Sequence, residues 1–190
     1  MNIARKWDGQ RQVLLTIDDY ALLERSDALA EYGRTELIEG VIIAMNAQFR
    51  PHARVKMQLV RAFFGALEGR GDELQILSEA SVAIPPRNMP EPDIVLTTQA
   101  EGEGPIPVES VRLLVEISND TLNFDLGDRA ALYAGGGIPE YWVVDIDGKR
   151  VTIHSGPTPD GYERKREVVF GDLLVSDTID GLAIKSDALR

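Results

Sequence analysis

Val111-Arg-Leu-Leu-Val-Glu-Ile-Ser118 is the stretch of sequence that decides the fold. Its run of apolar and β-branched residues is the strongest strand signal in the chain. One residue does not fit that pattern, because Glu116 lies between Val115 and Ile117 near the end of the run. Burying a carboxylate in an apolar strand costs free energy unless another group compensates its charge. This segment therefore predicts both a core strand and a candidate functional residue.

A second segment, Pro92–Thr97, has the same combination of features. Asp93 precedes the short apolar run Ile94-Val95-Leu96, which is typical of a buried strand. If the two strands are neighbours, Asp93 and Glu116 converge at one end of the sheet. Mg²⁺ prefers oxygen ligands and often needs only one or two carboxylates. The alternative is that Asp93 caps a turn while Glu116 ends an exposed strand face, and the spacing alone does not decide between them.

The rest of the chain surrounds these two strands with helices and further strands. Thr16-Ile-Asp-Asp19 resembles a capping box and predicts a helix to about Glu24. The order of elements predicts one α/β or α+β domain with a mixed sheet over residues 14–190, after a flexible leader over 1–13. The remaining expected elements are paired strands around Gly40 within 36–45, a helix over 51–67, a strand over 74–84, a loop over 100–107, a helix over 125–134 with Asp125 as its possible cap and Gly135-Gly-Gly137 as its stop, a hairpin of 139–145 and 149–155 around Asp147-Gly148, and late strands over 163–170 and 179–185.

Composition excludes several classes of protein. The 190 residues include no cysteine, which excludes disulfides, thiolate metal sites and a cysteine nucleophile. The absence of cysteine fits a reducing compartment, so we expect a cytoplasmic protein. No apolar run is long enough for a membrane span, and the first ten residues are too polar for a secretory signal. The net charge of −11 argues against a broad nucleic-acid footprint, but it leaves room for a small local site.

Six short motifs occur in an order that resembles the Uma-type putative restriction endonucleases of bacteria, which are members of the PD-(D/E)XK nuclease superfamily. Each motif alone is weak, and their order gives the resemblance its strength. The motifs are Thr16-Ile-Asp-Asp-Tyr20, Glu36-Leu-Ile-Glu-Gly40, His52 at the start of a helix, Glu91-Pro-Asp-Ile-Val95, Leu114-Val-Glu-Ile-Ser118, and Asp125 through Tyr133 followed by Gly137-Ile-Pro-Glu-Tyr-Trp-Val-Val-Asp145.

The resemblance implies a restriction-endonuclease-like core, in which helices flank a mixed β-sheet and further strands follow at the C-terminus. It implies that Asp93 and Glu116 are metal ligands for Mg²⁺ or Mn²⁺, and that Glu36 completes the acidic cluster. The position two residues after Glu116 is Ser118 instead of lysine. By the resemblance, the lysine function moves to the next helix, at the position of Arg129. The predicted catalytic residues are therefore Glu36, Asp93, Glu116 and Arg129.

Arginine at position 129 changes the chemistry, because a guanidinium keeps its proton whereas a lysine amine can release one. Arg129 can still counter charge on a phosphate. The alternative for this residue is a surface pair with Asp125 or Asp128. Two functions follow: a metal-dependent endonuclease that hydrolyses DNA, or a nuclease-fold binding or regulatory module that no longer cleaves.

Partner contacts are predicted from basic and apolar residues. His52, Arg54 and Lys56 lie near the start of the helix expected over 51–67 and are predicted to contact substrate phosphates. The alternative for His52 is a surface residue at a helix start. We expect weak DNA binding with little sequence preference, since no helix-turn-helix, finger or basic stripe is recognisable. Apolar residues in the late strands favour a homodimer, and no membrane contact is expected.

Overall fold

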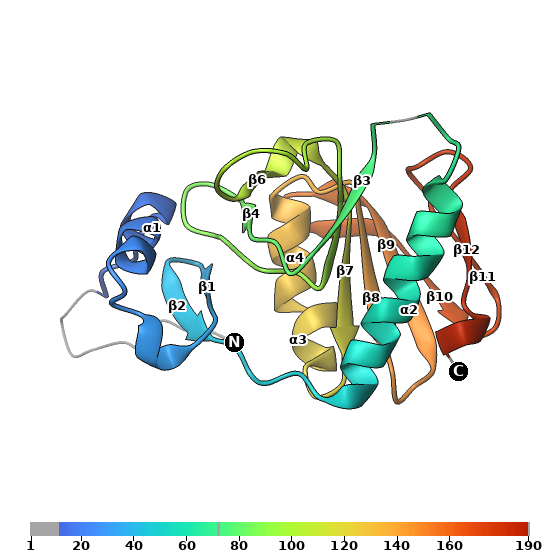
Figure 1. The fold of residues 1–190 in the computed structure, drawn as a ribbon, viewed down its shortest axis with the longest axis horizontal. Coiled ribbons are helices and arrows are strands. Elements are labelled where there is room, and N and C mark those ends of the chain that lie inside the picture. Colours follow the sequence, from blue (N-terminus) through green and yellow to red (C-terminus); the bar gives the residue numbers. More distant parts are fainter. Residues whose placement is uncertain (1–11, 72, 190) are drawn as a thin grey trace.

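The computed structural model describes residues 12–71 and 73–189, and a six-stranded mixed sheet forms its centre (Figure 1). The order of strands across the sheet is β10-β9-β8-β7-β5-β3. Only β7 and β8 are parallel, whereas the other neighbouring strands in this sheet are antiparallel. The strands are β3 (Gln75–Ser78), β5 (Ile94–Thr97), β7 (Val111–Ser118), β8 (Glu140–Asp145), β9 (Arg150–Thr158) and β10 (Gly161–Val169).

Helices cover both faces of this sheet (Figure 1). The long helix α2 (Arg50–Leu67) packs on one face, and α3 (Leu122–Leu126) with α4 (Asp128–Gly135) packs on the other. Successive side chains of a strand point to opposite faces. Along β7, Val115 accordingly packs in the core beneath α2, while Leu114 packs in the core beneath α4. Glu116, which is two residues after Leu114, is therefore directed toward α4.

A small N-terminal unit stands at one side of the sheet (Figure 1). It consists of α1 (Ile17–Arg25), a 3₁₀ turn (Ala30–Tyr32) and the hairpin of β1 (Thr35–Ile38) and β2 (Val41–Ala44). Its core contains Tyr20, Leu37 and Met89. The predicted capping box is confirmed, because Thr16 and Asp19 bond each other's backbone N–H at the start of α1. This unit positions Glu36, which lies in β1.

Two further strand pairs complete the fold. One is parallel, between β4 (Val82–Ala83) and β6 (Ile106–Pro107), and a 3₁₀ turn (Val108–Ser110) leads from β6 into β7. The other is antiparallel, between β11 (Leu173–Val175) and β12 (Ala183–Lys185), and is followed by a 3₁₀ turn (Asp187–Leu189). Leu174 and Ile184 pack into the same core as α2. The predicted α/β fold with a helix-flanked mixed sheet and C-terminal strands is confirmed.

Several predicted boundaries were wrong. The strand expected over 74–84 is two strands, β3 and β4, and the break between them includes Glu79 at a φ of 55°. The helix expected over 125–134 is interrupted at Gly127, which leaves helical geometry, so Asp125 lies inside α3 instead of capping a helix. The loop expected over 100–107 ends in β6, and the late strand expected over 179–185 is confined to β12.

The leader expected over residues 1–13 lies almost entirely outside the described residues. Of that segment the structure describes Gln12 and Val13, both of which are exposed. No helix within the described ranges combines the length and the apolar character needed to cross a membrane.

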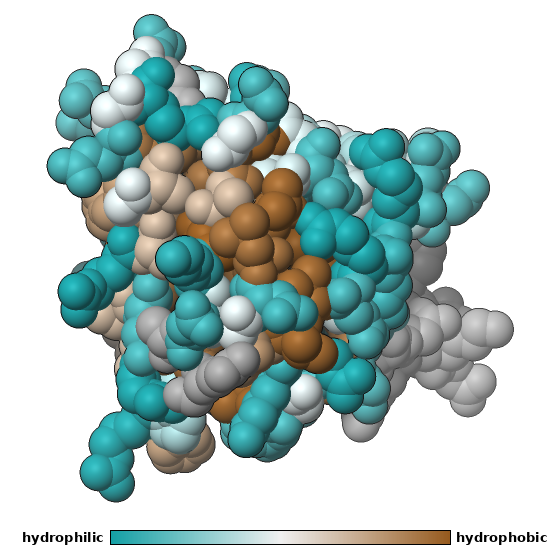
Figure 2. Space-filling model, turned by 90° about the vertical axis from the view of Figure 1, so that its right-hand side faces the viewer, coloured by the Kyte–Doolittle hydropathy of each residue, from teal (hydrophilic) through white to brown (hydrophobic). Residues whose placement is uncertain are grey.

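The late strands contribute to the core and also to the surface. Phe170 and Leu174 are buried, whereas Val169, Leu173 and Val175 are exposed. Figure 2 shows the side of the molecule on which β11 and β12 lie, and apolar residues gather near the middle of that face. A contiguous apolar patch is a common protein–protein contact surface. It is compatible with the homodimer, which stays a prediction.

Candidate active site

The pairing of β5 with β7 brings the two acidic strand residues together. Ile94 lies opposite Val115 in this antiparallel pair, so Asp93 comes opposite Glu116. Both are buried, with 5% and 7% of their surface exposed. The strands whose carboxylates were expected to converge are thus direct neighbours. Buried carboxylates require compensation, and the surrounding residues show how each one is compensated.

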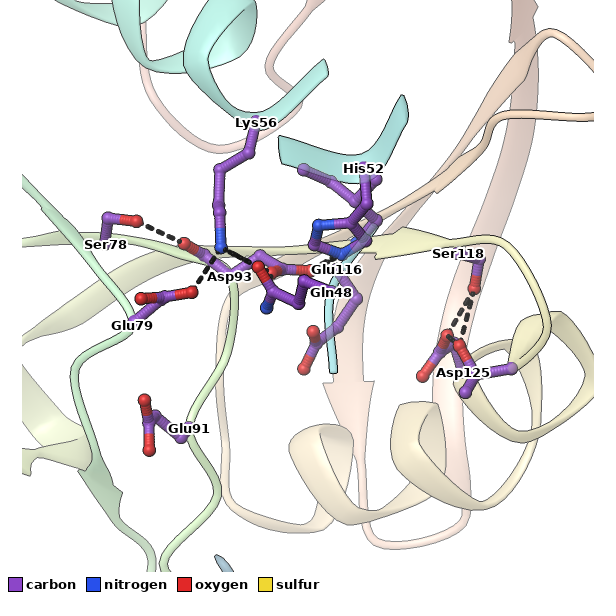
Figure 3. Close-up of polar contacts among 12 residues, drawn as sticks. Gln48, His52, Lys56, Ser78, Glu79, Glu91, Asp93, Glu116, Ser118 and Asp125 are labelled. Carbon is purple, nitrogen blue, oxygen red and sulfur yellow. Dashed lines mark hydrogen bonds and ion pairs between the residues drawn. The ribbon is translucent and has the colours of Figure 1, made fainter. Parts of the chain in front are cut away.

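Asp93 is held by donors from three segments of the chain (Figure 3). Its Oδ2 accepts a hydrogen bond from the backbone N–H of Ile117 at 2.9 Å and lies 3.1 Å from His52 Nε2. Its Oδ1 accepts from Gln48 Nε2 at 3.2 Å and from Lys56 Nζ at 3.3 Å. Burial acts to raise the pKa of Asp93, but His52, the Ile117 N–H and Lys56 together hold that pKa below its usual value. Asp93 is therefore an ionised carboxylate.

Glu116 has a different environment on the α4 side of the sheet. Its Oε1 accepts hydrogen bonds from Tyr133 Oη at 2.7 Å and from an Arg129 guanidinium nitrogen at 3.0 Å. Burial raises the pKa of Glu116 to about 8 even though Arg129 acts to lower it, and the nearby negative charges of Asp93 and Asp125 add to the rise. The cations of the protein therefore do not fully compensate this carboxylate.

Arg129 connects Glu116 to the N-terminal unit. Its two terminal nitrogens donate to both oxygens of Glu36, at 2.6 and 3.2 Å, in a bidentate pair. Its Nε lies 3.5 Å from Asp125 Oδ1. The i,i+4 pair with Asp125, considered above as a surface pair, thus exists in a buried form. Because these groups surround the guanidinium, Arg129 serves to bring Glu36, Glu116 and Asp125 together.

Lys56 lies at the site instead of facing solvent as a simple phosphate contact would. Its Nζ donates to Gln48 Oε1 and to Glu79 Oε1, each at 2.5 Å, in addition to Asp93. Figure 3 shows Lys56 and His52 approaching Asp93 from the same helix. Arg54, the third predicted phosphate contact, is exposed on α2 and lies outside this network. The structure thus brings two of the three predicted substrate-binding residues to Asp93.

Asp125 closes the other end of the site. It accepts hydrogen bonds from Ser118 Oγ and from Thr121 Oγ1. Burial raises its pKa, although these hydroxyls oppose the rise. The ring of Phe124 lies beneath the Arg129 guanidinium, with 5.0 Å between the guanidinium carbon and the ring centroid. Ser118 occupies the position two residues after Glu116, where the superfamily pattern has lysine. It therefore supports Asp125 and supplies no cation.

A cleft of about 480 Å³ opens over these residues. One wall is the segment 43–49, which leads from β2 into α2, and the other is formed by the end of β7 and by α3. This volume lies within the range typical of small-ligand pockets. The functional side chains that line it are Glu36, His52, Asp93, Asp125 and Arg129.

The residues fit a Mg²⁺-type site, in which the protein supplies few of the ligands, better than a site in which protein side chains supply all of them. Asp93 and Glu116 offer hard oxygen ligands on adjacent strands, and the raised pKa of Glu116 shows that its ionised form lacks full compensation, which a bound cation would supply. Within residues 12–71 and 73–189, no group of three or more histidine or acidic side chains is arranged to hold an ion. Mg²⁺ typically uses one or two carboxylates and takes its other ligands from water and phosphate.

Sequence reasoning missed several members of the site. Gln48 and Glu79 reach it from a loop and from the residue after β3, and no local pattern marks either one. Tyr133 has a weak signal, since it lies four residues after Arg129 on the same helix and therefore on the same face. The carboxylate of Asp125 was considered only as a helix cap or a surface partner. Its burial follows from the short helix α3, which was not predicted.

Comparisons with known proteins agree with this architecture. A family model described as Uma2, putative restriction endonuclease, matches residues 17–187. A solved structure of a putative nuclease belonging to DUF820 from Anabaena variabilis superposes with a TM-score of 0.69 at 17% sequence identity. That alignment covers 92% of this chain and 97% of the other. The search of curated proteins gives no match.

Proposed function

Because this chain belongs to the Uma2 family of putative restriction endonucleases, we propose that it is a nuclease that hydrolyses phosphodiester bonds of DNA with the help of a divalent metal ion. The observation that carries this proposal is the pair of buried carboxylates, Asp93 and Glu116, on adjacent strands, of which Asp93 lines the cleft. Burying such a pair in a core costs more free energy than burying apolar side chains would, so packing alone does not account for it.

Asp93 and Glu116 would hold Mg²⁺ or Mn²⁺, and the cofactor is part of the proposal. When bound, such an ion activates water for attack and withdraws charge from the phosphate. Asp93 is suited to the task because its lowered pKa keeps it ionised, and because the Ile117 N–H and His52 fix its orientation. Groups that orient a ligand are typically needed for strong metal binding.

Arg129 and Lys56 would divide the work that a single lysine performs in related sites. Arg129 is surrounded by acidic groups, so we assign it to hold Glu36 and Glu116 in place. Because Arg129 also lines the cleft, we assign it a contact with the substrate phosphate as well. Lys56 presents its ammonium group beside Asp93, where it can orient a water molecule or a phosphate oxygen. A compact point charge with three donors suits that role.

His52 is the remaining side chain of the cleft that we assign to the substrate. Its Nε2 contacts Asp93, while its buried Nδ1 has no hydrogen-bond partner among the described residues. We assign His52 to fix Asp93 and to contact the substrate phosphate. Arg54, exposed two residues after His52 on α2, is kept as a more distant phosphate contact.

A DNA cleavage assay tests the proposal. Purified wild type is incubated with supercoiled plasmid and with single-stranded circular DNA, in EDTA, in Mg²⁺ and in Mn²⁺, beside Asp93→Asn and Glu116→Gln. We expect cleavage in wild type only with metal, and a loss of at least about a hundredfold in each variant, since removing one member of a catalytic charge cluster typically has an effect of that order.

The matched control is Asp177→Asn, which removes a carboxylate that pairs with Arg166 on the surface far along the chain. It should cleave like wild type. Equal cleavage by wild type, Asp93→Asn and Glu116→Gln would identify a contaminating nuclease and would refute the assignment.

A second candidate function is a nuclease-fold module that no longer cleaves. It is favoured by one observation, namely that Arg129 replaces the expected lysine and is enclosed by Glu36, Glu116 and Asp125. The substitution Arg129→Lys discriminates between the candidates. If wild type is inert and Arg129→Lys cleaves, the site is intact but degraded at this position. Metal-dependent cleavage by wild type excludes the degraded reading.

A further inference from the structure

Phe49 stands at the mouth of the cleft and is exposed to solvent. It lines the cleft together with His52 and Asp93, and 71% of its surface is accessible. An aromatic ring that is exposed to this degree contributes little to the core. It lines, however, the same cleft as Asp93.

The position of Phe49 in α2 is also unfavourable for the helix. Phe49 is the N-cap residue and makes no side-chain capping hydrogen bond. Serine, threonine, aspartate and asparagine are preferred at an N-cap because their side chains satisfy a free backbone N–H of the first turn. Residues that break a local rule without structural gain concentrate at functional sites. Phe49 breaks two such rules, because its aromatic ring is exposed and because it occupies an N-cap without making a capping hydrogen bond.

The charge of the cleft is unsuited to binding a DNA duplex by its phosphates. Acidic residues in its lining include Glu36, Asp93, Asp120 and Asp125, while its basic side chains are His52 and the enclosed Arg129. Binding to a duplex draws its affinity mainly from cations that neutralise phosphates. Affinity in this cleft must therefore come from another source, and an exposed aromatic ring offers base stacking.

The depth of the site points in the same direction. Asp93 lines the cleft of about 480 Å³ with only 5% of its surface exposed, and Glu116, on the neighbouring strand, is buried behind the cleft lining. This space suits a nucleotide or two but not a double helix, whose major groove alone is about 12 Å wide. Enzymes that cannot reach their target within a duplex act on single strands or on nucleotides that leave the stack.

We propose that the substrate strand enters this cleft unpaired, as single-stranded DNA or as a locally opened end, with a base stacked on Phe49. His52, three residues further along α2, contacts Asp93 and lies where the adjoining phosphate would follow. Stacking on aromatic rings tolerates any base, since every base has a π-face. This inference rests on the proposed nuclease function and names its substrate class.

Fluorescence anisotropy with labelled oligonucleotides tests the inference. The probes are a single-stranded dT12 and a blunt 12-base-pair hairpin, both in Ca²⁺, which takes the same oxygen ligands as Mg²⁺. The variants are Phe49→Ala and Phe49→Tyr, with Phe64→Ala as the matched control. Phe64 is also on α2 and is 59% exposed, but it lines a separate surface cleft with Leu67, Leu74 and Ile76.

We expect wild type to bind dT12 more tightly than the hairpin. Phe49→Ala should weaken dT12 binding by between about 5-fold and 150-fold, which corresponds to the loss of one stacked base. Phe49→Tyr should retain most of the affinity because the ring is kept, and Phe64→Ala should bind like wild type. The melting temperature of Phe49→Ala should match that of wild type, which separates stacking from a folding defect.

Cleavage of the same two probes with Mn²⁺ distinguishes failure of this inference from failure of the proposed function. Binding of dT12 that depends on Phe49 without cleavage of either probe refutes nuclease activity and retains the stacking site. Preferred binding or cleavage of the hairpin, unchanged dT12 binding by Phe49→Ala, or no detectable binding of dT12 by wild type overturns the inference.

Discussion

Replacing Arg129 with methionine removes the cation that three buried carboxylates share. Glu36 accepts two hydrogen bonds from it, Glu116 accepts one, and Asp125 lies within 3.5 Å. Breaking a buried ion pair by removing one partner typically costs about 3–5 kcal/mol, because the remaining charge is buried without compensation. Arg129 serves several carboxylates, so we expect a cost near the upper end, about 5 kcal/mol. That is a large part of the roughly 5–15 kcal/mol by which domains are stable.

Urea unfolding followed by tryptophan fluorescence measures this cost, with Arg150→Met as the matched control. Arg150 also pairs with two carboxylates, Asp145 and Glu167, each at 3.4 Å, but its side chain is 45% exposed. Exposed ion pairs contribute about 0–1 kcal/mol, so this variant should differ little from wild type.

The pH dependence of the Arg129→Met deficit provides a second readout. Arg129 acts to lower the pKa of Glu116, so its removal should raise that pKa further above about 8. A group whose pKa is raised in the native state favours folding at low pH, and this advantage is lost as pH rises through the raised pKa. The deficit should therefore be smaller at pH 6 than at pH 9. Equal losses for Arg129→Met and Arg150→Met, or a deficit independent of pH, would refute the role given to Arg129.

Three further predictions concern residues outside the site. Burial lowers the pKa of His154 from 6.5 to about 4, so the neutral imidazole favours folding above pH 6.5 and this advantage is lost as pH falls toward 4. In urea titrations over that range, the free energy of unfolding of wild type should fall by about 3 kcal/mol relative to that of His154→Phe. Glu140 is fully buried and accepts five hydrogen bonds at up to 3.0 Å from Trp142 and the segment 176–178, so Glu140→Gln should cost about 3 kcal/mol, whereas the exposed Glu163→Gln should cost almost nothing. Thr16→Ala removes the N-cap of α1 and should lower the free energy of unfolding by about 1 kcal/mol in the same assay.

Local features of the sequence marked Asp93 and Glu116, but their convergence was predicted only on the condition that their strands are neighbours. Each carboxylate interrupts an apolar run, and the free-energy cost of burying it signals a function. Strand periodicity and the order of elements were sufficient for the mixed sheet. The pairing of β5 with β7 fulfils the condition and places Asp93 opposite Glu116.

The partners of these carboxylates were harder to predict because they come from distant segments. Glu79 reaches Lys56 from the position after β3, where its φ is positive, and Glu36 reaches Arg129 across 93 positions of sequence. No periodic pattern in the sequence marks the residues that make either contact. The break at Gly127 was missed for a related reason, since Asp125 to Ala134 has continuous helical character while tertiary contacts place Asp125 at the site.

Calorimetric titration of Mn²⁺ tests the proposed metal site most directly, because it measures binding without requiring a substrate. We predict one Mn²⁺ per chain in wild type, loss of that binding in Asp93→Asn and in Glu116→Gln, and unchanged binding in the surface control Asp177→Asn. The absence of Mn²⁺ binding by wild type, or equal binding by wild type and Asp93→Asn, would contradict the proposal that these two carboxylates form the catalytic metal site.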